Sequence, residues 1–164
     1  MRVICLLALL SVAAAPMPRV RSTTPVIASA LVEAEARSAT FRSLVRTIEQ
    51  TDGIVYVEPG QCRHGVHACL SLSVVSGGGV RLLRVLVDRV GDVAELIATI
   101  AHELRHAIEL LTEPSVTSVA AAYNYYAREA ATARGVFETA AAIRAGNAVF
   151  SELRASAKIR PLWR

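Results

Sequence analysis

The sequence predicts an α+β domain in which helices pack on a small antiparallel sheet. Three observations lead to this prediction. Residues 25–50 show helical hydrophobic periodicity, residues 54–88 contain β-branched and alternating runs, and residues 92–156 return to a helical pattern. At 164 residues, the chain is long enough to bury one hydrophobic core.

Residues 1–15, MRVICLLALLSVAAA, have the composition of a secretory signal peptide. Arg2 supplies the positive charge, Val3–Val12 form a short apolar run, and Ala13–Ala15 provide a small-residue cleavage site. The run is shorter than the roughly 20 apolar residues that span a bilayer. We therefore expect an exported protein, periplasmic or extracellular, without a membrane span after leader removal. A retained N-terminal anchor is the alternative.

Two helices are expected before the strands. The first begins at Pro25, because proline is tolerated in a first helical turn. Ser38 is placed to cap the second, ATFRSLVRTIEQ, in which Phe41, Leu44 and Ile48 recur at helical spacing. The chain is accordingly divided into a leader (1–15), a lead-in with the first helix (16–37), a single domain (38–157) and a C-terminal tail (158–164).

The middle of the chain is expected to form three strands. IVYVEP, from Ile54, is β-branched and aromatic and ends at Pro59-Gly60. CLSLSVVS alternates apolar and polar residues over 69–76, and VRLLRVLVD follows the three glycines at 77–79. Two strands joined by a short Gly-rich loop predict an antiparallel hairpin.

Three helices are expected after the strands. Asp92 can cap the first, VAELIATIAHELRHAIELL, and Pro114 interrupts the pattern beyond it. The second is expected over 115–133. Gly135 then separates it from the third, VFETAAAIRAGNAVFSELRAS, over 136–156.

The charge balance gives little information about partners. The net charge is +4, and arginine supplies all but one of the 18 basic residues. These arginines are spread along the chain, whereas nucleic-acid-binding proteins cluster basic side chains on one face. We therefore expect a solvated basic surface and no nucleic-acid partner.

Cys62 and Cys69 are the two cysteines that remain after the leader is removed. In an oxidising compartment, two cysteines seven positions apart are expected to form a disulfide that closes a local loop. The alternative is a zinc site that uses His64 and His67 between them. Structural zinc sites usually draw their ligands from two separated pairs, which favours the disulfide.

HELRH is an HExxH motif inside the first helix expected after the strands. Residues i and i+4 lie about 6 Å apart on one helix face, so His102 and His106 can converge on one metal ion. Glu103 is placed beside them, where it can take a proton from a metal-activated water. The alternative is a solvated polar face that the two histidines share with Glu95, Thr99 and Glu109.

The stretch IAHELRHAIE resembles the active helix of zincin metallopeptidases. It is more closely similar to small exported bacterial HExxH proteins of uncharacterised activity, over about Ser38 to Glu152. Only HExxH is a specific motif, and the flanking likeness is looser. The resemblance implies a zincin-like domain that binds Zn²⁺, with His102 and His106 as ligands and Glu103 as the general base.

A third protein ligand is required by this resemblance. Metzincins continue HExxH with a glycine and a third histidine, which HELRHAIELLTE lacks, and no histidine follows His106. A carboxylate ligand is therefore expected, as in Glu-type zincins. Glu138 is the first choice because it precedes alanines at helical spacing, where a buried carboxylate would need a cation. Glu129 is the second choice, and a salt bridge from Glu138 to an arginine is the alternative.

Residues around the motif have expected supporting roles. Glu109 follows His106 by three positions and is expected to accept a hydrogen bond from this histidine rather than to bind the metal. Arg105 is expected to point outward and to pair with an acid. Three tyrosines cluster further along, where one could donate to a developing oxyanion or all could belong to the core: Tyr123, Tyr125 and Tyr126.

The sequence thus predicts an exported zinc-dependent hydrolase, specifically a metallopeptidase that acts on a peptide or protein substrate. The alternative is a non-catalytic exported module whose structural or vestigial zinc site supports binding to a partner or to the cell envelope. Glu103 favours the enzyme, because a structural zinc site has no use for a general base. The sequence marks no specificity pocket and no oligomeric state.

Overall fold

A computed structural model describes residues 17–62, 66–88, 92–129, 131–133 and 136–158. The expected leader, His64 and residues 159–164 of the expected C-terminal tail lie outside these residues. The α+β class is confirmed, because the described residues form five helices and a small four-stranded sheet. In this part of the chain, no helix combines the length and the apolar character needed to cross a membrane.

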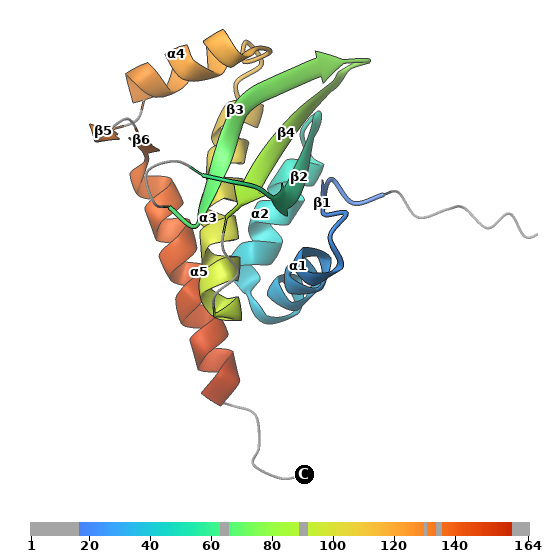
Figure 1. The fold of residues 1–164 in the computed structure, drawn as a ribbon, viewed down its shortest axis with the longest axis vertical. Coiled ribbons are helices and arrows are strands. Elements are labelled where there is room, and N and C mark those ends of the chain that lie inside the picture. Colours follow the sequence, from blue (N-terminus) through green and yellow to red (C-terminus); the bar gives the residue numbers. More distant parts are fainter. Residues whose placement is uncertain (1–16, 63–65, 89–91, 130, 134–135, 159–164) are drawn as a thin grey trace, which may run out of the picture.

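The five helices and three of the strands follow the order that the sequence predicts, and three further short strands were not expected (Figure 1). The helices are α1 (Pro25–Arg37), α2 (Ala39–Glu49), α3 (Val93–Leu111), α4 (Val119–Glu129) and α5 (Ala140–Lys158). The strands are β1 (Val20–Arg21), β2 (Gly53–Pro59), β3 (Ala68–Gly77), β4 (Val80–Val87), β5 (Ala131–Ala133) and β6 (Val136–Glu138).

The main sheet is mixed, so the prediction of an antiparallel sheet is wrong for two of its three strand pairings. The strand order is β1-β2-β4-β3. β3 and β4 form the expected antiparallel hairpin, whose turn contains Gly78 and Gly79 with positive φ angles of 59° and 75°. β2, however, pairs with β4 in parallel, and β1 pairs with β2 in parallel. β2 and β4 are therefore the two inner strands, and β3 lies at one edge of the sheet.

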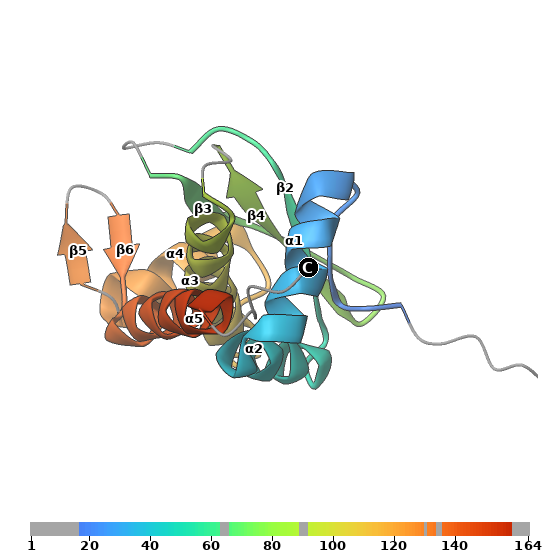
Figure 2. The ribbon, with the colours of Figure 1, turned by 90° about the horizontal axis from the view of Figure 1, so that it is seen from below.

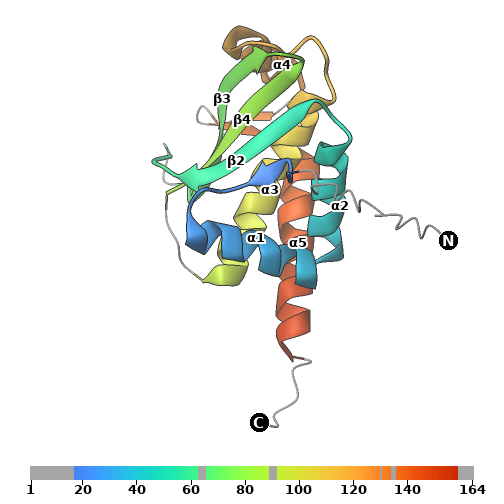
Figure 3. The same cartoon turned by 90° about the vertical axis from the view of Figure 1, so that its right-hand side faces the viewer.

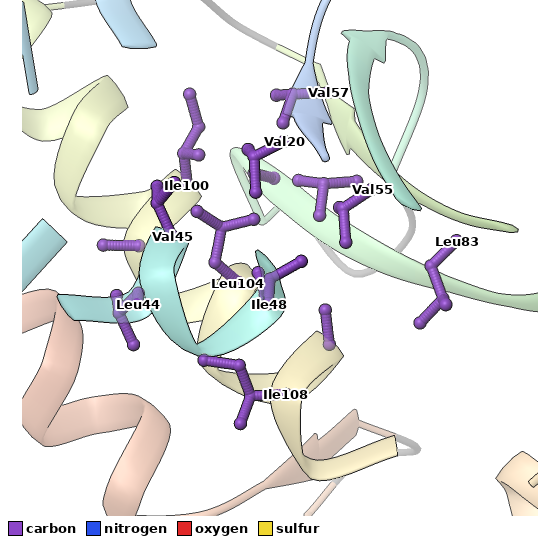
Figure 4. Packing of buried hydrophobic residues seen from close by; sticks show 14 of the residues in the cluster. Val20, Leu44, Val45, Ile48, Val55, Val57, Leu83, Ile100, Leu104 and Ile108 are labelled. Atoms are coloured by element: carbon purple, nitrogen blue, oxygen red, sulfur yellow. The ribbon is translucent and has the colours of Figure 1, made fainter. Parts of the chain in front are cut away.

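The hydrophobic core lies between one face of the sheet and the helices. Alternate residues of β2 and β4 are buried, among them Val55, Val57 and Leu83, as expected for strands with one covered face. Together with Ile48 of α2 and Leu104 of α3, which Figure 4 also labels, these side chains belong to one buried cluster. Each fully buried aliphatic side chain of this kind stabilises the fold by about 1.5–3 kcal/mol.

Helix α3 lies at the centre of the molecule, between the sheet and α5 (Figures 2 and 3). Asp92 caps its first turn as predicted, accepting hydrogen bonds from the amides of residues 94 and 95. At the other end, the buried guanidinium of Arg81 donates to the carbonyl groups of Leu110 and Leu111 and pairs with Asp52. The first turn of α3 is thus capped locally, and its last turn is fixed to β4.

The region after Pro114 differs from the prediction. α4 begins at Val119 and not at residue 115, and the chain then forms a two-stranded antiparallel hairpin, β5–β6, before α5. Thr139 caps α5, because its hydroxyl accepts a hydrogen bond from the amide of Ala142. The segment Val136–Glu138 therefore belongs to a strand, which agrees with the β propensity of its valine and phenylalanine.

Candidate metal centre

His102 and His106 lie one turn apart on α3, with their ring centroids 4.9 Å apart. Other parts of the protein cover the part of this helix face that carries the two histidines, whereas Glu95 at its start is exposed, so the histidines do not lie on a solvated polar face. The side chain of His106 is only 5% exposed and that of His102 is 19% exposed. The two imidazoles therefore line an interior cleft.

Glu138 completes a group of three potential metal ligands with His102 and His106, and these three residues are called the metal group below. Oε2 of Glu138 lies 3.3 Å from Nε2 of His102. One ligand atom from each of His102, His106 and Glu138 lies within 4.8 Å of the others, so this group could hold a metal ion. Two imidazole nitrogens and one carboxylate oxygen suit divalent transition metals, zinc among them.

The sequence argument for Glu138 rested on the wrong local structure. The residue ends β6 and does not lie on a helix face with alanines. The alanine-rich face exists on α5, where Ala142 and Ala145 are buried near α3. Glu138 reaches the site because the cap at Thr139 starts α5 directly after it. Glu129, the second choice, is exposed at the end of α4 and is outside the group of three.

Glu109 holds the ring of His106 in a defined orientation. Nδ1 of His106 lies 3.0 Å from Oε2 of Glu109, and the hydroxyl of Thr139 donates to Oε1 of Glu109 over 2.8 Å. Arg105 pairs with the same carboxylate over 3.7 Å. Burial raises the pKa of Glu109, but hydrogen bonds from His106 and Thr139 outweigh it, and the pKa is lowered. An ionised Glu109 keeps the ring proton of His106 on Nδ1.

The surroundings of Nε2 of His106 give the best test of whether a metal ion fits this site. Nε2 is buried, and none of the described residues gives it a hydrogen-bond partner. A buried polar atom without a partner is costly in free energy. Because Nδ1 carries the proton, Nε2 presents a lone pair toward the cleft. The residues present therefore fit a metal ion at this position.

Glu103 lies beside the group without being part of it. Its Oε2 accepts a hydrogen bond of 2.7 Å from the backbone amide of Leu70 in β3, and its Oε1 is 4.0 Å from Nε2 of His102. Burial raises the pKa of Glu103 to about 7. Burial lowers the pKa of His102, and the repulsion that would arise if both imidazoles were protonated lowers it further, which favours the neutral, ligating form of His102.

Tyr126 supports the site from the side of α4. Its buried hydroxyl donates to the backbone carbonyl of His106 over 2.8 Å, and its ring meets the His106 ring edge-on. This hydroxyl is therefore engaged with the backbone, and the role of oxyanion donor does not suit it. Tyr123 is largely exposed and packs on Phe137, and Tyr125 packs on Tyr126.

The predicted disulfide between Cys62 and Cys69 is confirmed, with their Cα atoms 5.9 Å apart. Because the two sulfur atoms are bonded to each other, the alternative zinc site at Cys62 and Cys69 has no thiolate ligands. The disulfide closes the loop that leads into β3, and its second cysteine, Cys69, directly precedes Leu70.

The sequence analysis missed two residues that contact the site, Leu70 through its amide and Thr139 through its hydroxyl. Only Thr139 carried a signal, as a cap before an alanine-rich helix.

A cavity of about 580 Å³ opens beside the metal group and is bounded by β3, α3, β6 and α5. His102, Glu103, His106 and Glu138 all line it. A small molecule or a side chain entering the cavity would thus reach the metal group directly.

Comparisons of the chain with protein-family models, with curated proteins and with solved structures found no match.

Proposed function

We propose that the protein is a zinc-dependent hydrolase, most specifically a metallopeptidase. The observation that carries this proposal is the buried, unpartnered Nε2 of His106, which faces the cleft together with His102 and Glu138. This donor set of two histidines and one glutamate leaves room for a fourth ligand. Catalytic zinc sites keep such an open position, whereas structural sites are closed by four protein ligands.

Each residue of the site has a separate task in the proposed reaction. When bound, zinc supplies Lewis-acid activation of a water molecule and of the substrate carbonyl. His102, His106 and Glu138 hold the ion. Glu103 accepts a proton from the attacking water and later delivers it to the departing amine. The hydrogen bond from Leu70 holds its carboxylate beside the metal group and out of it.

The alternative is a non-catalytic exported module with a structural zinc site. The position of Glu103 argues against it. A buried carboxylate that is anchored by one backbone amide and lies 4.0 Å from a ligand histidine has a clear use in hydrolysis. It has none in a site that only stabilises the fold.

The first experiment measures the metal content of the purified protein and of a His102→Ala, His106→Ala double variant. We expect about one zinc ion per chain in the parent and none in the variant. Glu103→Gln should keep its zinc and lose hydrolysis of a peptide library, whereas Glu129→Gln, an exposed matched control, should keep both. A parent protein that takes up no zinc at neutral pH would overturn the proposal.

A further inference from the structure

The cavity beside the metal group has an apolar lining on two sides. On β3, Leu70 and Leu72 lie two positions apart and so face the same side of the strand. On α5, Ile143 and Phe150 lie seven positions apart, on one face of the helix. Among the described lining residues, every carboxylate and imidazole belongs to the metal group or to its neighbour Glu103, and the hydroxyl of Tyr126 is engaged with the backbone of His106.

These apolar side chains remain partly open to the cavity. Ile143 is 46% exposed, and Leu70, Leu72 and Phe150 are half-buried. An isolated exposed aliphatic side chain is common on protein surfaces and needs no explanation. Four that converge on a concave space next to a metal group are different, because pockets for ligands combine an apolar lining with a few placed polar groups.

Gly146 allows the cavity to extend down to α3. A Cβ atom at this position would lie 3.1 Å from the carbonyl oxygen of Ala98 and 3.3 Å from Cβ of His102. The missing side chain lets α5 approach α3 closely beside His102. The cavity volume of about 580 Å³ falls within the range of about 300–1,000 Å³ that is usual for ligand pockets.

We propose that this cavity binds a bulky apolar side chain of the substrate, so that the protein acts on polypeptides carrying a leucine-like or phenylalanine-like residue beside the cleaved bond. This inference rests on the proposed function, because it assigns the substrate class of the same site. Leu72 and Ile143 would contact the substrate side chain from opposite walls. A charged side chain would lose its water there and find no opposite charge on either wall, because the described lining residues of β3 and α5 offer only the neutral amide of Asn147 as a polar side-chain group.

The first test compares cleavage by the zinc-loaded protein across a peptide library. We expect kcat/KM to be about 10- to 100-fold higher when leucine or phenylalanine is beside the cleaved bond than when aspartate or lysine is there. Ile143→Asp should reduce this preference at least tenfold, and Ile143→Leu should retain it. Val32→Asp, at a 70% exposed position of α1, is the matched control and should change nothing.

A second test needs no catalysis. Fluorescein-labelled Gly-Gly-Leu-Gly-Gly and Gly-Gly-Asp-Gly-Gly are titrated with Glu103→Gln, with and without zinc, and binding is followed by fluorescence anisotropy. We expect the leucine peptide to bind about tenfold more tightly, and Ile143→Asp to remove the difference. Equal binding of the two peptides would overturn the inference, as would cleavage without an apolar preference, and either result leaves the proposed function standing. Selective binding of the leucine peptide without any zinc uptake would support the apolar pocket and overturn the proposed function.

Discussion

At the scale of single residues, the contact between His106 and Glu109 determines how the site presents a ligand. Nδ1 of His106 faces Oε2 of Glu109 over 3.0 Å, and Nε2 is left toward the cleft. Outer partners of this kind orient a metal-binding histidine and increase its basicity. The affinity of the site for zinc should therefore depend on a residue that does not touch the metal.

We predict that Glu109→Ala weakens zinc binding by about 10- to 100-fold while the protein stays folded. Without the carboxylate, the ring of His106 loses the acceptor that holds its proton on Nδ1. Competition with a zinc-binding chromophore measures the affinity, and circular dichroism checks the fold. Glu113→Ala, at a carboxylate that bonds Ser115 outside the site, is the matched control. Equal zinc affinities in the two variants would contradict the assigned role of Glu109 in orienting His106.

Single residues of the site were predictable to different degrees. His102, Glu103 and His106 follow from the sequence because their spacing on a helix is a local property. Glu138 was found by an argument about a helix face, although it lies at the end of a strand. The amide of Leu70 could not be predicted, because any non-proline residue offers the same backbone donor and only the fold decides which one meets Glu103.

At the scale of elements, Arg81 of β4 fixes the end of the helix that carries the metal group. Its side chain is only 7% exposed, and its guanidinium donates to four backbone carbonyls around the end of α3. The last carbonyl groups of a helix have no partner within the helix, so a buried helix end needs donors from elsewhere. Arg81 supplies those donors.

We predict that Arg81→Met lowers the free energy of unfolding by about 3 kcal/mol, because buried carbonyl groups lose charged donors. Urea unfolding measures the change. Arg84→Met is the matched control on the same strand, since the Arg84 side chain is 62% exposed and its ion pair with Glu58 lies at the surface. That variant should differ from the parent by less than about 1 kcal/mol. Similar losses in both variants would contradict the assigned role of Arg81.

The disulfide acts on the entry to β3, directly before the amide that holds Glu103. We predict that a Cys62→Ser, Cys69→Ser variant loses about 2 kcal/mol of stability and keeps its affinity for zinc, because none of the three metal ligands lies in the closed loop. Hydrolysis should fall further than zinc binding, since Leu70 follows the released Cys69. Unfolding curves, zinc titration and peptide cleavage separate these effects. A parallel loss of zinc and activity would contradict this account.

The arrangement of elements was harder to predict than their existence. Helix and strand periodicities are local, so α2, β2 and α3 are found close to where the sequence places them. The parallel pairing of β2 with β4 joins strands separated by β3, and local patterns carry no information about it. The short hairpin β5–β6 was missed because its segments fall within longer stretches of helix-favouring alanine.

At the scale of the whole molecule, the site depends on segments that are far apart in the chain. α3 supplies the histidines, β3 holds Glu103, and β6 supplies Glu138 at the start of α5. α5 must therefore be held firmly against the rest of the domain. Near its other end, Glu152 accepts hydrogen bonds from the hydroxyls of Ser38 and Thr40 and from the amide of Thr40, all at the start of α2.

Glu152 makes this connection between α5 and α2 sensitive to acid. Burial raises the pKa of its carboxyl, but the hydrogen bonds from Ser38 and Thr40 outweigh burial and hold the pKa below its ordinary value of 4.5. A carboxyl whose pKa is lower in the folded state stabilises the fold fully above its unfolded-state pKa. That contribution is lost as the pH falls through the lowered pKa of the folded state.

We predict that the free energy of unfolding falls as the pH drops below about 4.5, and that Glu152→Gln flattens this dependence by removing one titrating group. At pH 7 the variant should be less stable than the parent, and the difference should shrink toward acid. Thermal unfolding from pH 7 to pH 3 measures both effects. Glu35→Gln, on the exposed side of α1, is the matched control and should leave the slope unchanged. A difference between Glu152→Gln and the parent that stays constant with pH would mean that the contact acts through packing and not through the charge.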